Sequence, residues 1–377
     1  MSERCQILPL PRTAASITRF LEVSHGIYNG DPHWVAPLIF DARKVFADAN
    51  PLFQHAEMQL WVARQDRKDV GRIAAILDRE HDRIHQDGAA FFGFFECPPD
   101  PAISRQLFAV AQDWARARGA KRLLGPMNPT TNDECGLLVD GFDSPPQLMM
   151  TYNPPYYEAL ILGEGFTCAK NLFAFQIEVA RCPLDRLRRI ADQTRRRNPE
   201  IRFTAVRQQT LTADLAKIKE VYNAAWQQNW GFTPMTSAEI DFLAGRLKPL
   251  LREGLVWLAE KPDEPIGFML ALPDFNEVIR PLRGRLLTPK ILGALPYLLN
   301  RRVPARCRVV TLGVKENFRN RGIEAVLLAE GLMTGLRLGF KEAEASWVLE
   351  DNLPMRRLLE PFGGKIYKTY RLYQRAL

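Results

Sequence analysis

Apolar and polar positions along this chain of 377 residues follow two different periods. Short segments with a period of two predict strands, and longer segments with apolar residues three or four apart predict helices. Residues 60–76 and 256–272 each contain two apolar strands joined by a polar turn, which is typical of a β-hairpin. Residues 103–119 and 323–339 each form an amphipathic pattern that ends at a glycine, as helices commonly do. These patterns predict an α/β protein with mixed sheets.

The order of these elements occurs twice along the chain. Residues 60–76 align without a gap with residues 256–272, and residues 152–166 resemble residues 351–365. In each half a predicted helix lies between the two matching segments, so we infer that one α/β unit has been duplicated. The predicted domains are residues 1–182 and 183–377.

Composition and charge narrow the class of protein. With 46% hydrophobic and 25% charged residues, the chain has the composition of a soluble globular protein. Its net charge of +8 favours anionic ligands. The charge is spread along the chain without a homopolymeric or arginine–glycine tract, so nucleic acid is the weakest partner hypothesis.

The cysteines and the first residues of the chain indicate the cellular compartment of the protein. The six cysteines are scattered without a C-x-x-C pair, which indicates neither a disulfide framework nor a zinc site, so no metal is expected. The first residues lack the pattern of a signal peptide, and the apolar runs are too short to span a bilayer. We therefore expect a cytoplasmic protein without a membrane span.

The segment from Leu312 to Leu328 carries the main functional hypothesis. An apolar strand is followed by the turn residues Arg319, Asn320, Arg321 and Gly322, where the helix of residues 323–339 is expected to begin. A helix start offers free N–H groups and a positive dipole end, which together hold phosphate. The sequence therefore predicts a pyrophosphate site between this strand and this helix.

The first half lacks the corresponding loop. Aligning the two helices by their terminal glycines places residues 98–102, PPDPA, opposite residues 318–322, FRNRG. Proline has no N–H group to donate, and the arginines and the glycine are absent from the first half. We expect that only the second half binds a phosphate, and that the first half supports or shapes the acceptor site.

A strand followed by R-x-x-G at a helix start, and a second strand that ends near Asn352, resemble the GNAT superfamily of acetyl-CoA-dependent N-acyltransferases. The duplication resembles its tandem two-domain members. This resemblance implies two domains, each with a mixed, splayed central sheet flanked by helices, and acetyl-CoA or another acyl-CoA in the gap of the C-terminal sheet. The residues that it assigns to the co-substrate are Gly313, Val314, Arg319, Asn320, Arg321, Gly322, Ile323, Glu324 and Asn352.

Two positions depart from the family pattern. Glu324 stands where the family usually has glycine or alanine, and a carboxylate there would repel a pyrophosphate unless it turned outward or paired with an arginine. Leu359 stands where many members have a tyrosine that serves as the general acid. Alternation predicts that residues 344, 346, 348 and 350 share one face of a strand, and Glu350, beside the expected mouth of the splay, is the candidate base. The candidate acid is Tyr370 or a neighbouring tyrosine on the final predicted strand. For both residues a purely structural role remains the alternative.

The predicted function is transfer of an acyl group, with acetyl-CoA as the first choice of donor, to the amine of a small molecule or peptide. One alternative is an aminoacyl or long-chain acyl transferase of the same architecture. Another is a GNAT-like protein that binds ligands and has lost catalysis. A homodimer is left open.

Three further segments have competing interpretations. His81 and His85, four residues apart, are candidates for a zinc site, although a solvated turn or short helix is favoured. Residues 128–136, which include Cys135, are either part of an acceptor pocket or plain structure. The basic and apolar insertion at residues 280–305 is a lid, a dimer contact or a contact with an acidic surface.

Overall fold

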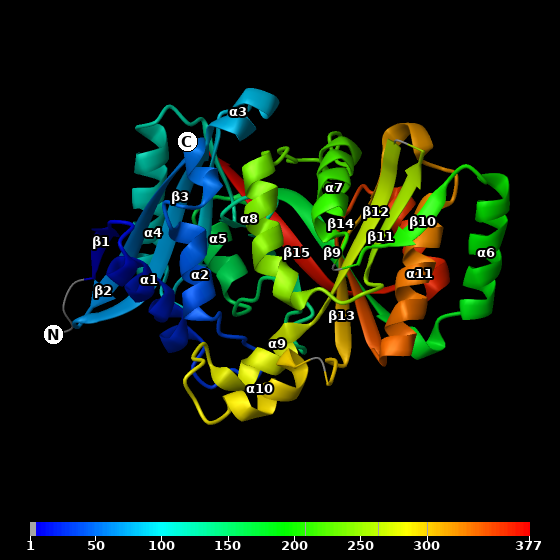
Figure 1. Ribbon diagram of the computed structural model, residues 1–377. Coiled ribbons are helices and arrows are strands. Elements are labelled where there is room, and N and C mark those ends of the chain that lie inside the picture. Colours follow the sequence, from blue (N-terminus) through cyan, green and yellow to red (C-terminus); the bar gives the residue numbers. More distant parts are fainter. Residues whose placement is uncertain (1–4, 208, 263, 300) are drawn as a thin grey trace. The chain divides into compact units, whose positions relative to one another are not determined.

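The computed structural model describes residues 5–207, 209–262, 264–299 and 301–377 (Figure 1). These residues form two compact units, and each unit is built from more than one segment of the chain. Unit 1 holds the described residues of Met1–Leu172, Ile279–Ile291 and Lys368–Leu377, and unit 2 holds those of Phe173–Val278 and Leu292–Tyr367. The domain boundary between residues 182 and 183 stays a prediction about the duplicated sequence.

Unit 1 is built on a mixed sheet. Its strands follow the order β1-β2-β3-β4-β5-β15, and β8 also pairs with β15. Neighbours are antiparallel except for β4 and β5, which are parallel. The strands are β1 (Gln6–Leu10), β2 (Ala56–Gln65), β3 (Lys68–Asp78), β4 (Ala89–Glu96), β5 (Arg122–Gly125), β8 (Leu137–Asp140) and β15 (Lys365–Ala376, in unit 1 from Lys368), with a separate hairpin of β6 (Met127–Asn128) and β7 (Glu134–Cys135).

The helices of unit 1 cover this sheet. Helix α4 buries Ile103, Leu107 and Phe108 in a core with the strand residues Ile73 and Phe92, because its apolar residues recur three or four positions apart. The predicted first hairpin is confirmed as β2 and β3. The helices are α1 (Ala14–Ile27), α2 (Ile39–Phe46), α3 (Arg79–His85), α4 (Pro101–Arg116) and α5 (Tyr157–Gly163), with 3₁₀ turns at Pro51–Gln54 and Arg280–Leu282.

The strands of unit 2 also combine parallel and antiparallel pairs. Its strands follow the order β9-β14-β13-β12-β11-β10, and β13 and β14 are parallel. The predicted second hairpin is confirmed as the antiparallel pair β11 and β12. The strands are β9 (Thr167–Glu178, in unit 2 from Phe173), β10 (Arg202–Ala205), β11 (Val256–Lys261), β12 (Glu264–Pro273), β13 (Arg306–Val314) and β14 (Glu342–Leu349).

Two apolar layers cover the two faces of this sheet. Neighbouring strand residues point to opposite faces, so Met269 packs with α6 and α11 while Phe268 packs with α7 (Figure 1). The helices are α6 (Leu184–Arg197), α7 (Leu211–Ala225), α8 (Ser237–Leu247), α9 (Phe275–Ile279), α10 (Ile291–Leu298), α11 (Ile323–Leu338) and α12 (Leu353–Leu359), with 3₁₀ turns at Val179–Arg181, Lys248–Leu250, Glu316–Phe318 and Glu360–Phe362. Among the described residues, every helix is too short or too polar to cross a membrane.

Candidate active site

Strands β13 and β14 of unit 2 part from each other halfway along their length. Their parallel register runs from Arg306 opposite Glu342 to Val309 opposite Ala345 and ends there. Beyond that point β13 continues to Val314 with its other edge paired to β12, and β14 continues to Leu349. We call this point the fork. Past the fork, the edge of β13 that carries Gly313 and Val314 is not paired with β14 within the described residues.

The N-terminus of α11 follows directly after the strand that forms one side of the fork. Gly322 is its N-cap residue with φ +83°, and Asn320 also has a positive φ of 63°. Within the described ranges, no protein group accepts the N–H groups of Arg321, Ile323 or Ala325. The helix is sixteen residues long, so its dipole and these N–H groups have the features of the anion site that the sequence predicts. Binding of an anion there stays a prediction.

Glu324 lies in the first turn of α11. Its carboxylate accepts a hydrogen bond from its own backbone N–H, and burial raises the pKa of this carboxyl while the charge of Arg319 opposes the shift. A protonated carboxyl does not repel a phosphate, whereas the ionised form does. The charge that Glu324 brings to the predicted anion site is therefore expected to change with pH.

The neighbouring arginines have different surroundings. The guanidinium of Arg319 donates hydrogen bonds to the carbonyl oxygens of Ala225 at 2.6 Å and Val314 at 3.3 Å, and so ties the loop to the end of α7 and to β13. Arg321 is exposed, and its guanidinium lies 5.2 Å from the ring centre of Phe318. Arg319 therefore supports the loop, and Arg321 is the more accessible cation for a phosphate.

Two glycines of the predicted site are explained by close contacts. A Cβ atom on Gly322 would lie 2.7 Å from Oγ1 of Thr194 on α6, and one on Gly313 would lie 2.3 Å from the ring of Trp226. The Trp226 ring also packs against Tyr222 and covers β13 beyond the fork. Glycine at these positions therefore permits the approach of α6 and of an aromatic ring, and Gly322 in addition permits the positive φ.

Asn352 and Ile323 have structural roles in the described fold. The side-chain oxygen of Asn352 accepts the N–H of Met355 at 3.1 Å and caps α12. The side chain of Ile323 is fully buried in the core, so only its backbone faces the loop. Contact of either residue with a co-substrate stays a prediction.

A buried polar cluster lies at the base of the fork. We call Arg308, Glu344, Ser346 and Tyr367 the fork cluster. Arg308 on β13 is directly opposite Glu344 on β14, one position before the register ends. The exposed fractions of the two residues are 1% and 0%. Charged side chains are rarely buried to this extent unless they are paired.

Hydrogen bonds connect every member of this cluster. The hydroxyl of Ser346 donates to Oε1 of Glu344 at 2.6 Å, and Nε of Arg308 donates to the Ser346 hydroxyl at 2.8 Å. Nε of Arg308 forms an ion pair with the Glu344 carboxylate at 3.7 Å, and the Tyr367 hydroxyl donates to Oε2 of Glu344. The cluster thus places a carboxylate and a phenol, an acid–base pair, at the point where the two strands separate.

Part of this cluster is predicted by the sequence. Alternation predicts that residues 344, 346, 348 and 350 lie on one face of β14. This is wrong at Val348, which packs in the apolar core with Ala343 and Ala345. Arg308 was missed. A charged residue in the middle of the apolar strand RCRVVTLGV was the signal that could have found it.

The two predicted catalytic residues belong to different compact units. Glu350 is half-buried in the turn after β14, and its carbonyl oxygen accepts a hydrogen bond from Arg356 at 3.1 Å. Tyr370 is fully buried on β15 in unit 1, opposite Leu138 of β8. The roles of Glu350 as base and Tyr370 as acid stay predictions.

In unit 1 the parallel strands β4 and β5 also separate, and residues 127 and 128 lie beside the unpaired part of β4. Strands β4 and β5 pair only from Ala89 to Phe91, and β4 continues to Glu96. Beyond the pairing, the side-chain oxygen of Asn128 accepts the N–H of Phe94 at 2.6 Å. A Cβ atom on Gly93 would lie only 1.7 Å from the carbonyl oxygen of Met127.

The N-terminus of the helix that follows in unit 1 is capped by a side chain. The Asp100 side chain accepts the N–H of Ala102 at 2.8 Å and caps α4, whereas α11 has no side-chain cap among the described residues. These contacts support the prediction that the first half binds no acyl-CoA.

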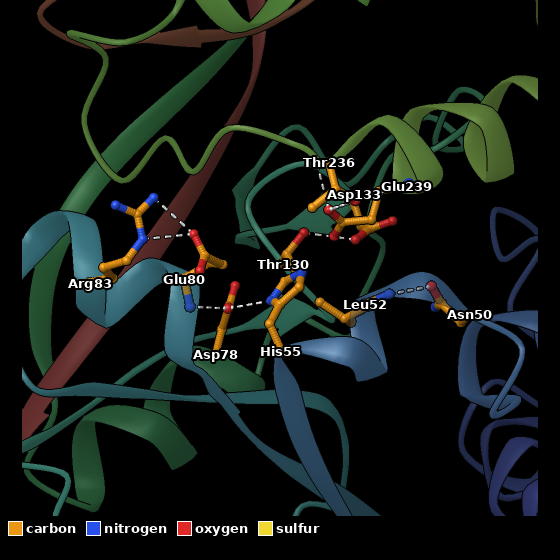
Figure 2. A network of polar contacts seen from close by, with 10 residues as sticks. All are labelled: Asn50, Leu52, His55, Asp78, Glu80, Arg83, Thr130, Asp133, Thr236 and Glu239. Carbon is orange, nitrogen blue, oxygen red and sulfur yellow. Dashed lines mark hydrogen bonds and ion pairs between the residues drawn. The ribbon is translucent and has the colours of Figure 1, made fainter.

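Other polar groups of unit 1 are drawn in Figure 2. Nδ1 of His55 lies 2.8 Å from Oδ1 of Asp78, which also accepts the N–H of Glu80 at 2.9 Å and caps α3. The hydroxyl of Thr130 donates to Asp133 at 2.8 Å, within residues 128–136. The bond of Thr130 lies within the segment for which the sequence predicts an acceptor pocket or plain structure, and both interpretations stay open.

The segment of the two histidines is the short helix that the sequence favours, and His81 is its only buried residue. His81 is buried, its Nε2 lies 3.3 Å from Asp87, and burial lowers the pKa of its imidazole. The rings of His81 and His85 lie 4.3 Å apart on one face of the helix. Groups of three or more metal-ligating side chains were not found among the described residues.

Comparison with known proteins agrees with this geometry. Residues 215–363 match the Acetyltransferase (GNAT) family. A protein of Caulobacter vibrioides (strain NA1000 / CB15N) named "Bacterial ceramide synthase" is 35% identical over 383 aligned positions, which cover 98% of this chain and 97% of that protein. "Protein YghO" of Escherichia coli (strain K12) is 31% identical, with 95% and 92% of the two chains covered.

A solved structure extends the comparison to the whole fold. The structure described as a tandem GNAT protein from the clavulanic acid biosynthesis pathway superposes with a TM-score of 0.61, at 14% identity, over 99% of this chain and 98% of that chain. The chain therefore belongs to the GNAT superfamily and has its tandem architecture.

Proposed function

We propose that this protein is an acyl-CoA-dependent N-acyltransferase whose acceptor is the amine of a long-chain amino alcohol. The observation that carries the proposal is the fork between β13 and β14 beside the uncapped N-terminus of α11. The relative named "Bacterial ceramide synthase" supports the choice of substrates, since a ceramide is the amide of a fatty acid and a long-chain amino alcohol. A long-chain acyl-CoA thus replaces acetyl-CoA as the preferred donor.

Different residues of unit 2 bind the pyrophosphate and the pantetheine arm of the co-substrate. The N–H groups at the start of α11, with Arg321, hold the pyrophosphate of the co-substrate. The unpaired edge of β13 at Gly313 and Val314 accepts the amide groups of its pantetheine arm, as an added strand would be accepted. This arrangement directs the thioester toward the base of the fork.

The chemistry requires movement of one proton. The acceptor amine attacks the thioester carbonyl, a C–N bond forms, the C–S bond breaks, and the amine proton must be taken up while the thiolate is protonated. In the fork cluster, Glu344 accepts a proton and the Tyr367 hydroxyl supplies one to the thiolate. Glu350 and Tyr370 are the rival base and acid, and variants of each separate the two assignments.

A coupled assay tests this function. The purified protein is incubated with palmitoyl-CoA or acetyl-CoA, with or without sphinganine, and release of free thiol is followed. We expect thiol release that needs both the long-chain donor and the amine, together with an amide product by mass spectrometry. Thiol release that stays at the uncatalysed rate with every donor and amine would favour the interpretation as a ligand-binding protein.

The aminoacyl alternative keeps one specific observation in its favour. The Glu324 carboxylate occupies the first turn of α11, where an ionised form opposes the binding of a pyrophosphate. If aminoacyl-tRNA supports amide formation and no acyl-CoA does, this alternative replaces the proposal.

A further inference from the structure

Exposed leucines are concentrated in one short segment of the chain. Of the twelve large apolar side chains that are exposed in the described residues, six lie between positions 286 and 299. Leu287 is completely exposed, and Leu292 and Leu299 are exposed by 66% and 60%. Single exposed leucines are ordinary, but a group of this size marks an interaction surface.

Helix α10 in unit 2 presents several of these leucines together. Leu292, Leu295 and Leu299 are spaced three and four positions apart, so they lie along one face of the helix and its C-terminal extension. Ala294 is buried, which shows that another side of α10 packs against the protein. The helix is therefore anchored by one side, while its leucines are exposed to solvent. Figure 1 shows the course of α10.

The same segment is strongly basic. Residues 280–302 contain no aspartate or glutamate. Six cations of this segment are exposed, namely Arg280, Arg283, Arg285, Lys290, Arg301 and Arg302. Within unit 2, the leucines on one face of α10 are followed by the exposed Arg301 and Arg302, and this combination is typical of helices that lie in the interface of an anionic membrane.

We propose that α10 and the adjoining Arg301 and Arg302 dock on the surface of a bilayer that contains anionic lipids. The leucines enter the boundary between headgroups and acyl chains, and the arginines contact lipid phosphates. The proposal goes beyond acyl transfer and does not rest on it, since it is argued from the exposed leucines and arginines of α10 and the residues after it.

Charge argues against a second copy of the chain as the occupant. In a symmetric dimer the same patch meets itself, so the exposed cations of one copy would face those of the other without a carboxylate between them. An anionic lipid surface provides the opposite charge and accepts the leucines as well.

Vesicle flotation tests the proposal with the full chain. Vesicles are made of phosphatidylcholine alone, or with phosphatidylglycerol at about one lipid in three to set a negative surface charge. We expect the protein to float with the anionic vesicles and to be bound at least tenfold less by neutral ones.

Two pairs of variants identify the surface. Leu295→Ser with Leu299→Ser, and separately Arg301→Gln with Arg302→Gln, are each expected to reduce the fraction bound at least tenfold. The matched controls are Leu162→Ser with Leu336→Ser, exposed leucines elsewhere, and Arg196→Gln with Arg197→Gln, exposed arginines on α6. Circular dichroism confirms that each variant is folded.

Two results would overturn the proposal. One is absence of flotation with either vesicle type, and the other is flotation that the α10 variants leave unchanged. Sedimentation velocity of the same samples is the third readout. A dimer that the leucine pair dissociates, without vesicle binding, would assign the patch to a second copy. Acyl transfer between dissolved substrates is measured in parallel, so failure of membrane binding and failure of the proposed function are distinguished.

Discussion

Arg308 and Glu344 lie directly opposite each other on parallel strands, one position before these strands separate, and both are almost completely buried. Their side chains form an ion pair at 3.7 Å that Ser346 bridges with two short hydrogen bonds. Taking two charges out of water costs free energy that only pairing and hydrogen bonding offset. Such a pair at a fork is evidence that the charges serve the site as well as the fold.

The first prediction concerns the stability of this pair. Arg308→Met is expected to lower the free energy of unfolding by about 3–5 kcal/mol, because it leaves the Glu344 carboxylate buried without its cation. Urea unfolding measures the change. Arg188→Met, which removes an exposed arginine from α6, should change the same quantity by less than about 0.5 kcal/mol. A loss below about 1 kcal/mol for Arg308→Met would mean that the pair is hydrated.

The second prediction concerns the catalytic carboxylate. Glu344→Gln keeps the shape of the side chain and removes its basicity, so kcat should fall by about 10²–10⁴-fold while KM for the acyl-CoA changes little. Glu350→Gln is the matched variant and should keep most of the activity. A large loss of kcat in Glu350→Gln, with little loss in Glu344→Gln, would assign the base to Glu350. Unfolding curves of both variants separate loss of chemistry from loss of fold.

The third prediction concerns Gly322. Gly322→Ala should destabilise the fold by about 1–3 kcal/mol, because it places a side chain at a positive φ and against Thr194. Adding Thr194→Ala should recover part of this loss, since it removes the contact and leaves the backbone strain. Gly335→Ala within α11 is the control, because a Cβ atom there meets its nearest neighbour at 3.8 Å and the change should be neutral or stabilising. Equal changes in the free energy of unfolding for Gly322→Ala and Gly335→Ala would show that the positive φ and the close approach of Thr194 on α6 do not require glycine at position 322.

The fourth prediction concerns pH and Glu324. Burial raises the pKa of this carboxyl, so the folded chain keeps the proton at pH values where the unfolded chain has released it. The stability that this group contributes is present below the ordinary pKa of a glutamic acid and is lost as pH rises through the raised value. Glu324→Gln should therefore gain stability relative to the unchanged protein across that window.

Binding of the co-substrate should follow the same titration. As Glu324 ionises with rising pH, the affinity for CoA is expected to fall, and Glu324→Gln should show a flat affinity over the same range. Calorimetric titration at several pH values measures this. An affinity of the unchanged protein that does not vary with pH would show that the carboxylate does not face the phosphates.

Local patterns in the sequence predicted the helices and strands well. They did not predict the contacts between segments that are distant in the sequence. The hairpin of β11 and β12 and the helix that ends at Gly339 follow from periods of two and 3.6 and from a glycine C-cap. The pairing of Arg308 with Glu344 depends on the register of two parallel strands, which a helix separates in sequence. Neither period nor composition determines such a register.

The loop residues illustrate the same limit on the site. Arg319 and Gly322 stand where the sequence predicted a phosphate loop, and the free N–H groups of α11 agree with that prediction. The bonds from Arg319 to Ala225 and Val314 and the contact of Gly322 with Thr194 arise from tertiary packing. One residue can serve both packing and a ligand, and the sequence pattern alone does not separate the two roles.

Calorimetric titration of the full chain with CoA is the most direct test of the central claim, the proposal that the fork and the start of α11 form an acyl-CoA site. The account predicts saturable binding of one CoA per chain, weakened at least tenfold by Arg321→Glu and unchanged by Arg105→Glu, an exposed arginine on α4 of unit 1. Absence of heat and of a thermal shift at millimolar CoA, or binding that Arg105→Glu abolishes and Arg321→Glu leaves intact, would contradict it.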